Sequence, residues 1–221
     1  MKAMILSAGF GTRLMPLTEN LPKALVEYKN IPMINYQIER IKKTGADEII
    51  INAHHHHDKI ISFFRENDFG IKISVIVEDE ILGTGGGILN AKKYLKNEDY
   101  FLVINTDVET DFDISGMFVK FESEKPFSMI AVQNRDSKRK LEFTDAMHLL
   151  KREDSGSEKK KLYAFNGIHI ISKEIFELYQ KKIFRDIFDI YFDAIINFNK
   201  VISGFDVKES TFKDLGKTEN L

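Results

Sequence analysis

The chain has 221 residues, 43% hydrophobic and 30% charged, a composition ordinary for a soluble globular protein of one large domain or one domain with a small appendage. Its 32 basic and 34 acidic side chains leave a net charge of −2, which argues against nucleic acid as the main partner because phosphate neutralisation needs a basic excess. The absence of cysteine excludes disulfides, thiolate metal sites and a cysteine nucleophile. No stretch approaches the roughly 18 apolar residues of a membrane helix, so we expect a cytoplasmic protein with no membrane partner.

The first half of the chain alternates short apolar runs with helical patterns. Strand composition is found in residues 3–8, 48–52, 71–77 and 100–105, and helical spacing in residues 32–43, 58–67 and 87–95. Strands that alternate with helices are typical of a mostly parallel sheet covered on both faces. We therefore expect an α/β protein with a Rossmann-like three-layer α/β/α architecture.

The second half is less regular. It contains expected strands at 127–133 and 163–171, expected helices at 173–181 and 186–198, a basic cluster at 135–140 and a polar stretch at 151–161. The polar stretch carries Ser155, Gly156 and Ser157, and it indicates an exposed hairpin tip or loop. Because no linker separates the halves, we expect a single domain over residues 1–221, with a mixed sheet and a small antiparallel insertion.

A loop with two glycines and two cations follows the first expected strand. Gly9 and Gly11 would let the backbone approach a phosphate closely, and Arg13 and Lys23 supply the positive charge that a polyphosphate needs. The glycines alone would equally suit a tight strand-to-helix turn. The third glycine of the dinucleotide fingerprint is missing, since that position is Leu14, and the P-loop lysine is missing too. The two cations nevertheless favour an anion-binding loop.

Two aspartates are candidate metal ligands. Asp107 follows the apolar strand 100–105, and ligands of open parallel sheets bind at the carboxyl ends of strands. Asp214 lies near the C-terminus and could complete a magnesium site, because Mg²⁺ takes few protein carboxylates and many phosphate oxygens. Each aspartate taken alone is more typical of a surface turn, and their spacing does not show that they meet.

Two further segments stand out. The run Leu82-Gly83-Thr84-Gly85-Gly86-Gly87 precedes an expected helix, and its N–H groups would be bare for a base edge, a ribose or a phosphate. Four consecutive histidines at 54–57 follow an expected strand. Catalytic zinc usually takes ligands from separated positions, so we interpret this run as a strand-to-helix loop rather than a metal site.

Together these residues resemble the sugar-1-phosphate nucleotidyltransferase family, whose pattern is Gly-x-Gly-Thr-Arg-Leu-x-Pro-Leu-Thr followed by Pro-Lys. The chain carries the whole pattern in Gly9, Gly11, Thr12, Arg13, Leu14, Pro16, Leu17, Thr18, Pro22 and Lys23. The resemblance continues through residues 82–87, 105–107, 165–168 and 212–216. The compact form most resembles the small N-acetylmuramate-1-phosphate uridylyltransferases and mannose-1-phosphate guanylyltransferases.

The resemblance implies a reaction and a distribution of roles. A sugar 1-phosphate would attack the α-phosphate of a nucleoside triphosphate in line, with Mg²⁺, giving an NDP-sugar for the cell envelope and pyrophosphate. Arg13, Lys23 and Asp107 would be catalytic, and Asp107 and Asp214 would bind the metal. The nucleotide would be bound by Ser7, Ala8, Gly9, Gly11, Thr12, Arg13, Gly83, Thr84 and Gly85, and the sugar by Asn105, Asn166 and Gly167. Residues 1–110 would form the nucleotide-binding half and residues 111–221 the sugar-binding half.

Some positions depart from the family pattern. Ser7 stands where alanine or glycine is usual, and Thr106 replaces a glycine beside the metal carboxylate. Lys213 neighbours Asp214 and should point away from it if strand alternation holds. The Glu-Lys-Pro segment that contacts sugar in longer relatives is not recognisable near residues 152–161, which leaves the sugar open.

Several alternatives stay open on the sequence. The base could be uracil, guanine or cytosine, and the acceptor could be phosphocholine or a similar phospho-alcohol. A non-catalytic nucleotide-sugar binding or regulatory module is a further alternative, although a module without turnover would be free to lose Arg13, Lys23, Asp107 or Asp214. The chain could be a monomer or a homodimer, and its C-terminus could be natural or truncated.

Overall fold

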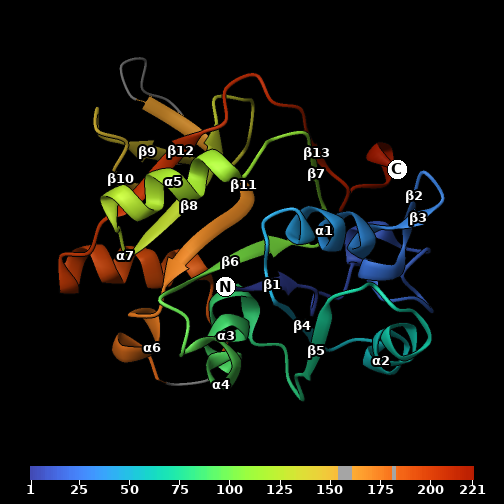
Figure 1. Cartoon of the computed structure of the whole chain (residues 1–221). Helices are drawn as coiled ribbons and strands as arrows, with labels where there is room; N and C mark the ends of the chain where they lie inside the picture. Colours follow the sequence, from blue (N-terminus) through green and yellow to red (C-terminus); the bar gives the residue numbers. More distant parts are fainter. Residues whose placement is uncertain (154–160, 181–182) are drawn as a thin grey trace.

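The computed structural model describes residues 1–153, 161–180 and 183–221 (Figure 1). Most of the polar stretch expected at a hairpin tip therefore lies outside the described residues. Among the described residues, nine strands form one sheet. They are β1 (Lys2–Leu6), β4 (Glu48–Ala53), β5 (Lys72–Val77), β6 (Tyr100–Asn105), β8 (Ser128–Gln133), β9 (Lys140–Phe143), β10 (Leu149–Glu153), β11 (Lys161–Ser172) and β12 (Ile202–Asp206).

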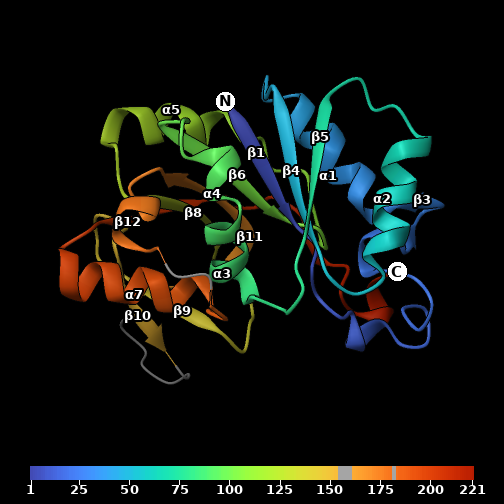
Figure 2. The ribbon, with the colours of Figure 1, turned by 90° about the horizontal axis from the view of Figure 1, so that it is seen from below.

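The sheet is mixed and contains a parallel core. Strand β1 lies between β4 and β6, parallel to both, and β5 continues this parallel part beyond β4 (Figure 2). Strand β11 runs antiparallel to β6 and β8, and β12 pairs parallel with β8. The hairpin of β9 and β10 extends the first part of β11 as a small antiparallel region. The expected mixed, mostly parallel sheet is confirmed.

Helices cover both faces of the sheet. One layer contains α1 (Met33–Lys42), α2 (His57–Glu66) and α5 (Ser115–Glu124), and the other contains α3 (Gly83–Asn90), α4 (Lys92–Leu95), α6 (Ile175–Leu178) and α7 (Ile187–Phe198). The alternation of side chains along β1 explains why two cores form: Ala3 and Ile5 pack under the first layer and Met4 packs under the second. The three-layer α/β/α architecture is therefore confirmed. No helix formed by the described residues has the length and apolar character to cross a membrane.

Two local expectations need correction, and one helix was not expected. Helix α3 begins at Gly83, so the glycine run lies inside the helix rather than before it. The helix expected over 173–181 is only four residues long, Ile175–Leu178, with residue 181 outside the described chain. Helix α5 was not expected, because it buries only Met117 and Phe121 and shows little apolar periodicity.

Short strands outside the main sheet were also not expected, and one pair of them shapes the site. Strands β2 (Glu27–Tyr28) and β3 (Ile31–Pro32) form a small hairpin. Strands β7 (Val108–Thr110) and β13 (Phe212–Asp214) pair antiparallel, with Asp214 opposite Val108. Strands of two or three residues carry too little periodicity to be read from a single sequence.

Candidate active site

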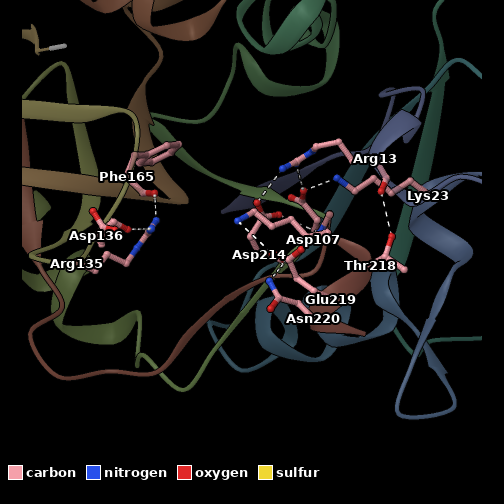
Figure 3. A network of polar contacts seen from close by, with 12 residues as sticks. Arg13, Lys23, Asp107, Arg135, Asp136, Phe165, Asp214, Thr218, Glu219 and Asn220 are labelled. Carbon is pink, nitrogen blue, oxygen red and sulfur yellow. Dashed lines mark hydrogen bonds and ion pairs between the residues drawn. The ribbon is translucent and has the colours of Figure 1, made fainter. Parts of the chain in front are cut away.

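Four charged side chains from three distant parts of the chain meet at one point. The Lys23 ammonium donates a hydrogen bond to the Asp107 carboxylate, and the Arg13 guanidinium contacts two carboxylates, with its NH1 3.0 Å from Asp214 Oδ2 and its NH2 3.8 Å from Asp107 Oδ2. Figure 3 shows this network. Arg13 is 57% exposed whereas Lys23 is 15% exposed, so Arg13 has the greater freedom to reorient toward a ligand. The structure thus brings together the residues expected for catalysis and metal binding.

Backbone pairing fixes this arrangement. Pairing of β13 with β7 places Asp214 next to the carboxyl end of β6, and the Leu215 N–H donates to the Asp107 carbonyl at 2.8 Å. The Gly216 N–H donates to Asp214 Oδ1 at 3.0 Å. A Cβ on Gly216 would lie 2.7 Å from both Arg13 NH2 and Asp107 Oδ2. The absence of a side chain at this position is therefore what allows the charged groups to converge.

Lys213 confirms the expected alternation along β13. Its ammonium lies 3.4 Å from the Tyr28 hydroxyl and 5.6 Å from the centre of that ring, whereas Asp214 faces Arg13. The lysine beside the candidate metal ligand therefore points away from the charged centre.

A cavity of about 230 Å³ adjoins the charged centre at the carboxyl ends of the parallel strands. Its lining includes Ser7, Ala8, Gly9, Lys23, Gly83, Thr84, Asn105 and Asp107 from the expected set, together with Leu6, Asn52, Ile81 and Thr106. The hydroxyls of Ser7 and Thr106 are buried and have no hydrogen-bond partner within the described residues. Buried polar atoms without partners are costly, and a bound ligand with polar groups would satisfy them.

Sequence reasoning missed a buried polar network that forms part of the wall of this cavity. The Asn52 carboxamide accepts a hydrogen bond from the Ser7 N–H at 2.9 Å and donates to Glu78 Oε1 at 2.7 Å, while Glu78 Oε2 accepts from the Leu82 N–H at 3.2 Å. Burial raises the pKa of Glu78. This network ties the loop after β1 to the glycine run. Its signal in the sequence was a polar residue at the end of each of two apolar strands.

The glycine run differs from the expectation of bare N–H groups. The N–H groups of Gly85 and Gly86 both donate to the Arg185 carbonyl, at 2.9 and 3.2 Å, and the Thr84 hydroxyl accepts from the Ile187 N–H at 2.8 Å. A Cβ on Gly86 would collide with the backbone just before α7. The glycines therefore allow this segment to pack against the helix, and Gly85 does not line the cavity.

Two other predicted loop residues, Gly11 and Thr12, lie outside the cavity lining. Gly11 has a positive φ of 69°, and its carbonyl accepts a hydrogen bond from the Thr18 hydroxyl at 2.9 Å. Thr12 begins a single turn of 3-10 helix that carries Arg13. Contact of Gly11 and Thr12 with a nucleotide stays a prediction.

Two predicted sugar-side residues lie in an irregular part of β11. Register with β8 shifts between Phe165 and His169, and this shift contains Asn166 and Gly167. A Cβ on Gly167 would lie 3.1 Å from Asn105 Nδ2, which places this bulge against the cavity lining. Asn166 accepts a hydrogen bond from Arg135 Nε at 3.1 Å. The basic cluster had suggested no role for Arg135 in the site.

The first three histidines form the turn between β4 and α2, and His57 begins α2. His54 Nδ1 lies 2.8 Å from the Glu78 carbonyl, and the His54 and His55 rings contact Phe10 edgewise or at a tilt. Desolvation and the neighbouring histidines lower the pKa of His55. Across the described ranges, no three His, Cys, Asp or Glu side chains are grouped as metal ligands. Asp107 and Asp214 both present carboxylate oxygens to the Arg13 guanidinium, and binding of a hard cation by these two residues stays a prediction.

Comparison with known proteins places this site in context. A model of the family described as nucleotidyl transferase matches residues 2–143. Mannose-1-phosphate guanylyltransferase 1 of Arabidopsis thaliana is 34% identical over 185 residues, which cover 80% of this chain and 51% of that protein. The corresponding enzyme of Aspergillus oryzae is 44% identical over 115 residues, 51% of this chain and 32% of that one. The chain thus spans about half the length, or less, of these curated relatives.

Solved structures share the fold over the whole chain. HddC from Yersinia pseudotuberculosis, in complex with GMP-PN, superposes with a TM-score of 0.80 at 28% identity and covers 99% of this chain and 95% of that one. A putative glucose-1-phosphate thymidylyltransferase from Bacillus anthracis gives a TM-score of 0.84 at 22% identity and covers 100% and 92%. The second likeness supports the fold alone. The family match over well over half of the sequence shows that this chain belongs to the nucleotidyl transferase family.

Proposed function

We propose that this chain is a sugar-1-phosphate nucleotidyltransferase that makes an NDP-sugar and pyrophosphate. The observation that carries the proposal is the convergence of Arg13, Lys23, Asp107 and Asp214 beside a cavity lined by the loop after β1. Cations and carboxylates in one network suit a reaction that must bring two anions together. A loop lined by backbone groups suits a nucleotide.

The reaction needs positioning more than proton transfer. An oxygen of the sugar 1-phosphate attacks the α-phosphorus of the triphosphate, the bond from that phosphorus to the bridging oxygen breaks, and pyrophosphate leaves. The attacking oxygen is already anionic near pH 7, so no general base is required. Catalysis of this kind rests on in-line placement and on stabilisation of developing charge.

The two cations would divide the work according to their placement. Arg13 has a long, exposed side chain, and its guanidinium would bind the leaving pyrophosphate, where negative charge grows. Lys23 is largely buried at the cavity wall and would hold the α-phosphate and the sugar phosphate close to the in-line arrangement. Both must exchange a carboxylate partner for a phosphate when substrates enter.

Asp107 and Asp214 would hold Mg²⁺, the cofactor expected for this family. Their carboxylates are hard oxygen donors drawn to one guanidinium, and a divalent ion takes remaining ligands from phosphate oxygens and water. When bound, the ion would neutralise charge on the reacting phosphates. With Asp107 and Asp214 holding the ion, the Arg13 guanidinium would be free to bind the pyrophosphate.

The donor and acceptor are first sought among those named in the relatives. Because two relatives are named mannose-1-phosphate guanylyltransferases and HddC was solved with GMP-PN, GTP and mannose 1-phosphate are the first pair to test. The buried hydroxyls of Ser7 and Thr106 would donate hydrogen bonds to the bound nucleotide.

The test is pyrophosphate release in the presence of Mg²⁺. Five triphosphates (GTP, UTP, CTP, ATP and dTTP) are combined with a panel of sugar 1-phosphates and with phosphocholine. Turnover of a sugar 1-phosphate that disappears in Asp107→Asn and persists in Lys213→Gln supports the proposal. Lys213→Gln is the matched control because Lys213 adjoins Asp214 in sequence and points away from it.

Other outcomes would overturn the proposal. Turnover of phosphocholine alone would assign a cytidylyltransferase acting on a phospho-alcohol. Nucleotide binding with no turnover on any acceptor would instead favour a binding or regulatory module.

A further inference from the structure

Arg135 and Asn166 form a region that we call the acceptor side of the site. Arg135 is held there by neutral partners. Its Nε donates to Asn166 Oδ1 at 3.1 Å, its NH2 donates to the Phe165 carbonyl at 2.9 Å, and its NH1 lies 3.5 Å from the Asp136 carbonyl. The guanidinium carbon also lies 3.8 Å above the centre of the Phe212 ring. These contacts fix the position of the guanidinium without neutralising its charge.

No carboxylate among the described residues pairs directly with this half-buried cation. Burial lowers the pKa of Arg135, while the negative charge of Asp214 acts in the opposite direction. A charge removed from water without a counter-ion is unfavourable, and proteins usually compensate it by a partner. A bound anion would therefore compensate the positive charge of Arg135.

Asn166 provides a second, independent sign of a ligand. The residue is 1% exposed, and because its Oδ1 accepts a hydrogen bond from Arg135, its Nδ2 group is turned away from that contact. This Nδ2 is buried and has no hydrogen-bond partner in the described part of the chain. A buried N–H donor without an acceptor is uncommon in folded proteins and is relieved by a bound acceptor.

The pair lies next to the charged centre. Phe212, under the Arg135 guanidinium, is two residues before Asp214 on β13, so the two side chains share a face of the strand. In the view of Figure 3, Arg135 and Phe165 lie on one side of Asp214, and Arg13 and Lys23 lie on the other. An acceptor whose phosphate sits at the charged centre would extend its sugar toward Arg135.

We propose that Arg135 and Asn166 recognise a second anionic group on the acceptor, so that the preferred substrate is a sugar 1-phosphate carrying an additional carboxylate or phosphate. This inference rests on the proposed nucleotidyl transfer and specifies its acceptor class. The planar guanidinium would bind the anion with its remaining N–H groups, and the Asn166 amide would add a neutral donor.

Matched acceptors distinguish whether the second anionic group is a carboxylate or a phosphate. Mannose 1-phosphate is the neutral-ring parent, mannuronic acid 1-phosphate adds a carboxylate and mannose 1,6-bisphosphate adds a phosphate, and the corresponding glucose series runs in parallel. Each is assayed for pyrophosphate release with the triphosphate that the wild-type chain uses best. We expect kcat/KM for an anionic acceptor to exceed that of its parent by about 10- to 100-fold, the range of a charge-assisted hydrogen bond. Which acceptor shows the excess identifies the anion.

Three variants distinguish recognition from a structural role. Arg135→Gln should remove the preference, through KM for the acceptor rather than for the triphosphate, and Arg135→Lys should keep part of it. Asn166→Asp should also remove it, because the new carboxylate would neutralise Arg135 from within. Lys138→Gln, which removes an exposed charge from the same basic cluster, is the control and should leave the preference intact.

The inference and the proposed function fail in different ways. Wild-type turnover without preference for an anionic acceptor would overturn this inference and leave nucleotidyl transfer standing. An equal loss on all acceptors in Arg135→Gln, with a lowered thermal midpoint and an unchanged preference in Asn166→Asp, would assign Arg135 a purely structural role. Silence of the wild-type chain on every acceptor would overturn the function and this inference with it.

Discussion

The charged centre and the acceptor side differ in how their charges are balanced. At the charged centre, two cations and two carboxylates already form ion pairs with one another, so the site is electrically satisfied before substrates arrive. On the acceptor side, Arg135 contacts carbonyl and amide oxygens and the Phe212 ring, and the Asn166 Nδ2 group has no hydrogen-bond partner among the described residues. The charged groups of the first region can exchange their ion-pair partners for substrate phosphates during a reaction. The second region has an uncompensated cation that can bind an anion.

The difference also separates general chemistry from selectivity. Any nucleotidyl transfer needs cations for the phosphates and carboxylates for a metal, and those residues would serve every acceptor. A fixed cation with neutral partners would serve only acceptors that bring their own negative charge. Substitutions at the charged centre should therefore lower turnover on all acceptors, and substitutions on the acceptor side should change their ranking.

The largest effect is expected from charge removal at the centre. Asp107→Asn, Lys23→Gln and Arg13→Gln should each lower kcat by about 100- to 1000-fold, the range seen when one preorganised charge-stabilising group is lost. Pyrophosphate release measures the effect, with Asp145→Asn as a control because Asp145 is 98% exposed on the turn after β9. If one of these three variants changed the ranking of acceptors instead of lowering kcat on all of them, the charged centre would also determine acceptor selectivity. That result would contradict the distinction between the two regions.

A smaller effect is expected when the centre keeps its charges but loses its spacing. Gly216→Ala places a methyl group 2.7 Å from Arg13 NH2 and Asp107 Oδ2, so these groups must move apart. Displacement of a positioned catalytic group by about 1 Å costs up to about 100-fold in rate, and we expect kcat to fall within this limit. Gly116→Ala is the control, since a Cβ there would meet only Phe205 at 3.5 Å. Unchanged kcat in Gly216→Ala would show that the convergence of charges is not required.

The cavity hydroxyls should have weaker effects, confined to nucleotide binding. Thr106→Val and Ser7→Ala each remove a buried hydroxyl that has no partner in the described structure. We expect KM for the triphosphate to rise about 5- to 10-fold, the equivalent of one neutral hydrogen bond, while thermal stability is unchanged or raised. A lower thermal midpoint with unchanged KM would mean that these hydroxyls serve the fold rather than the ligand.

The last prediction concerns the pH dependence of stability rather than activity, and it involves a buried histidine on β11. His169 on β11 is buried against Tyr191, and burial lowers its pKa to about 3 from 6.5. The unfolded chain then binds the additional proton first, so His169 contributes full stability above pH 6.5 and loses it as the pH falls toward 3.

Denaturant unfolding at several pH values measures this contribution. The loss should be about 1 kcal/mol for each pH unit below the pKa of the unfolded histidine. His169→Gln cannot titrate and should show a flatter dependence between pH 7 and pH 5 than the wild-type chain. Equal slopes for the two proteins would show that His169 is not the titrating group.

Sequence and structure agree best where function lies in a contiguous motif. The loop that carries Arg13 and Lys23 could be recognised because its residues are neighbours along the chain. The meeting of Asp107 with Asp214 could not, because it depends on the pairing of two three-residue strands, β7 and β13. The glycine run was read as free backbone because the segment that packs on it lies about a hundred residues later.

The acceptor side shows the same limit more strongly. Arg135 was noted only as part of a basic cluster, and its position depends on a register shift in β11 that no local pattern predicts. Parallel strands and their covering helices could be predicted because period-2 and period-3.6 patterns are local. Bulges and short pairings depend on tertiary contacts, which a single sequence does not display.

The central claim is most directly tested by the fate of the α-phosphate. The wild-type chain is incubated with Mg²⁺, a sugar 1-phosphate and a triphosphate labelled either at the α- or at the γ-phosphate. Nucleotidyl transfer predicts the α-label in an NDP-sugar and the γ-label in pyrophosphate, with both products absent in Asp107→Asn. Release of the α-label as free nucleoside monophosphate, or of the γ-label as inorganic phosphate, would contradict the account by identifying a hydrolase.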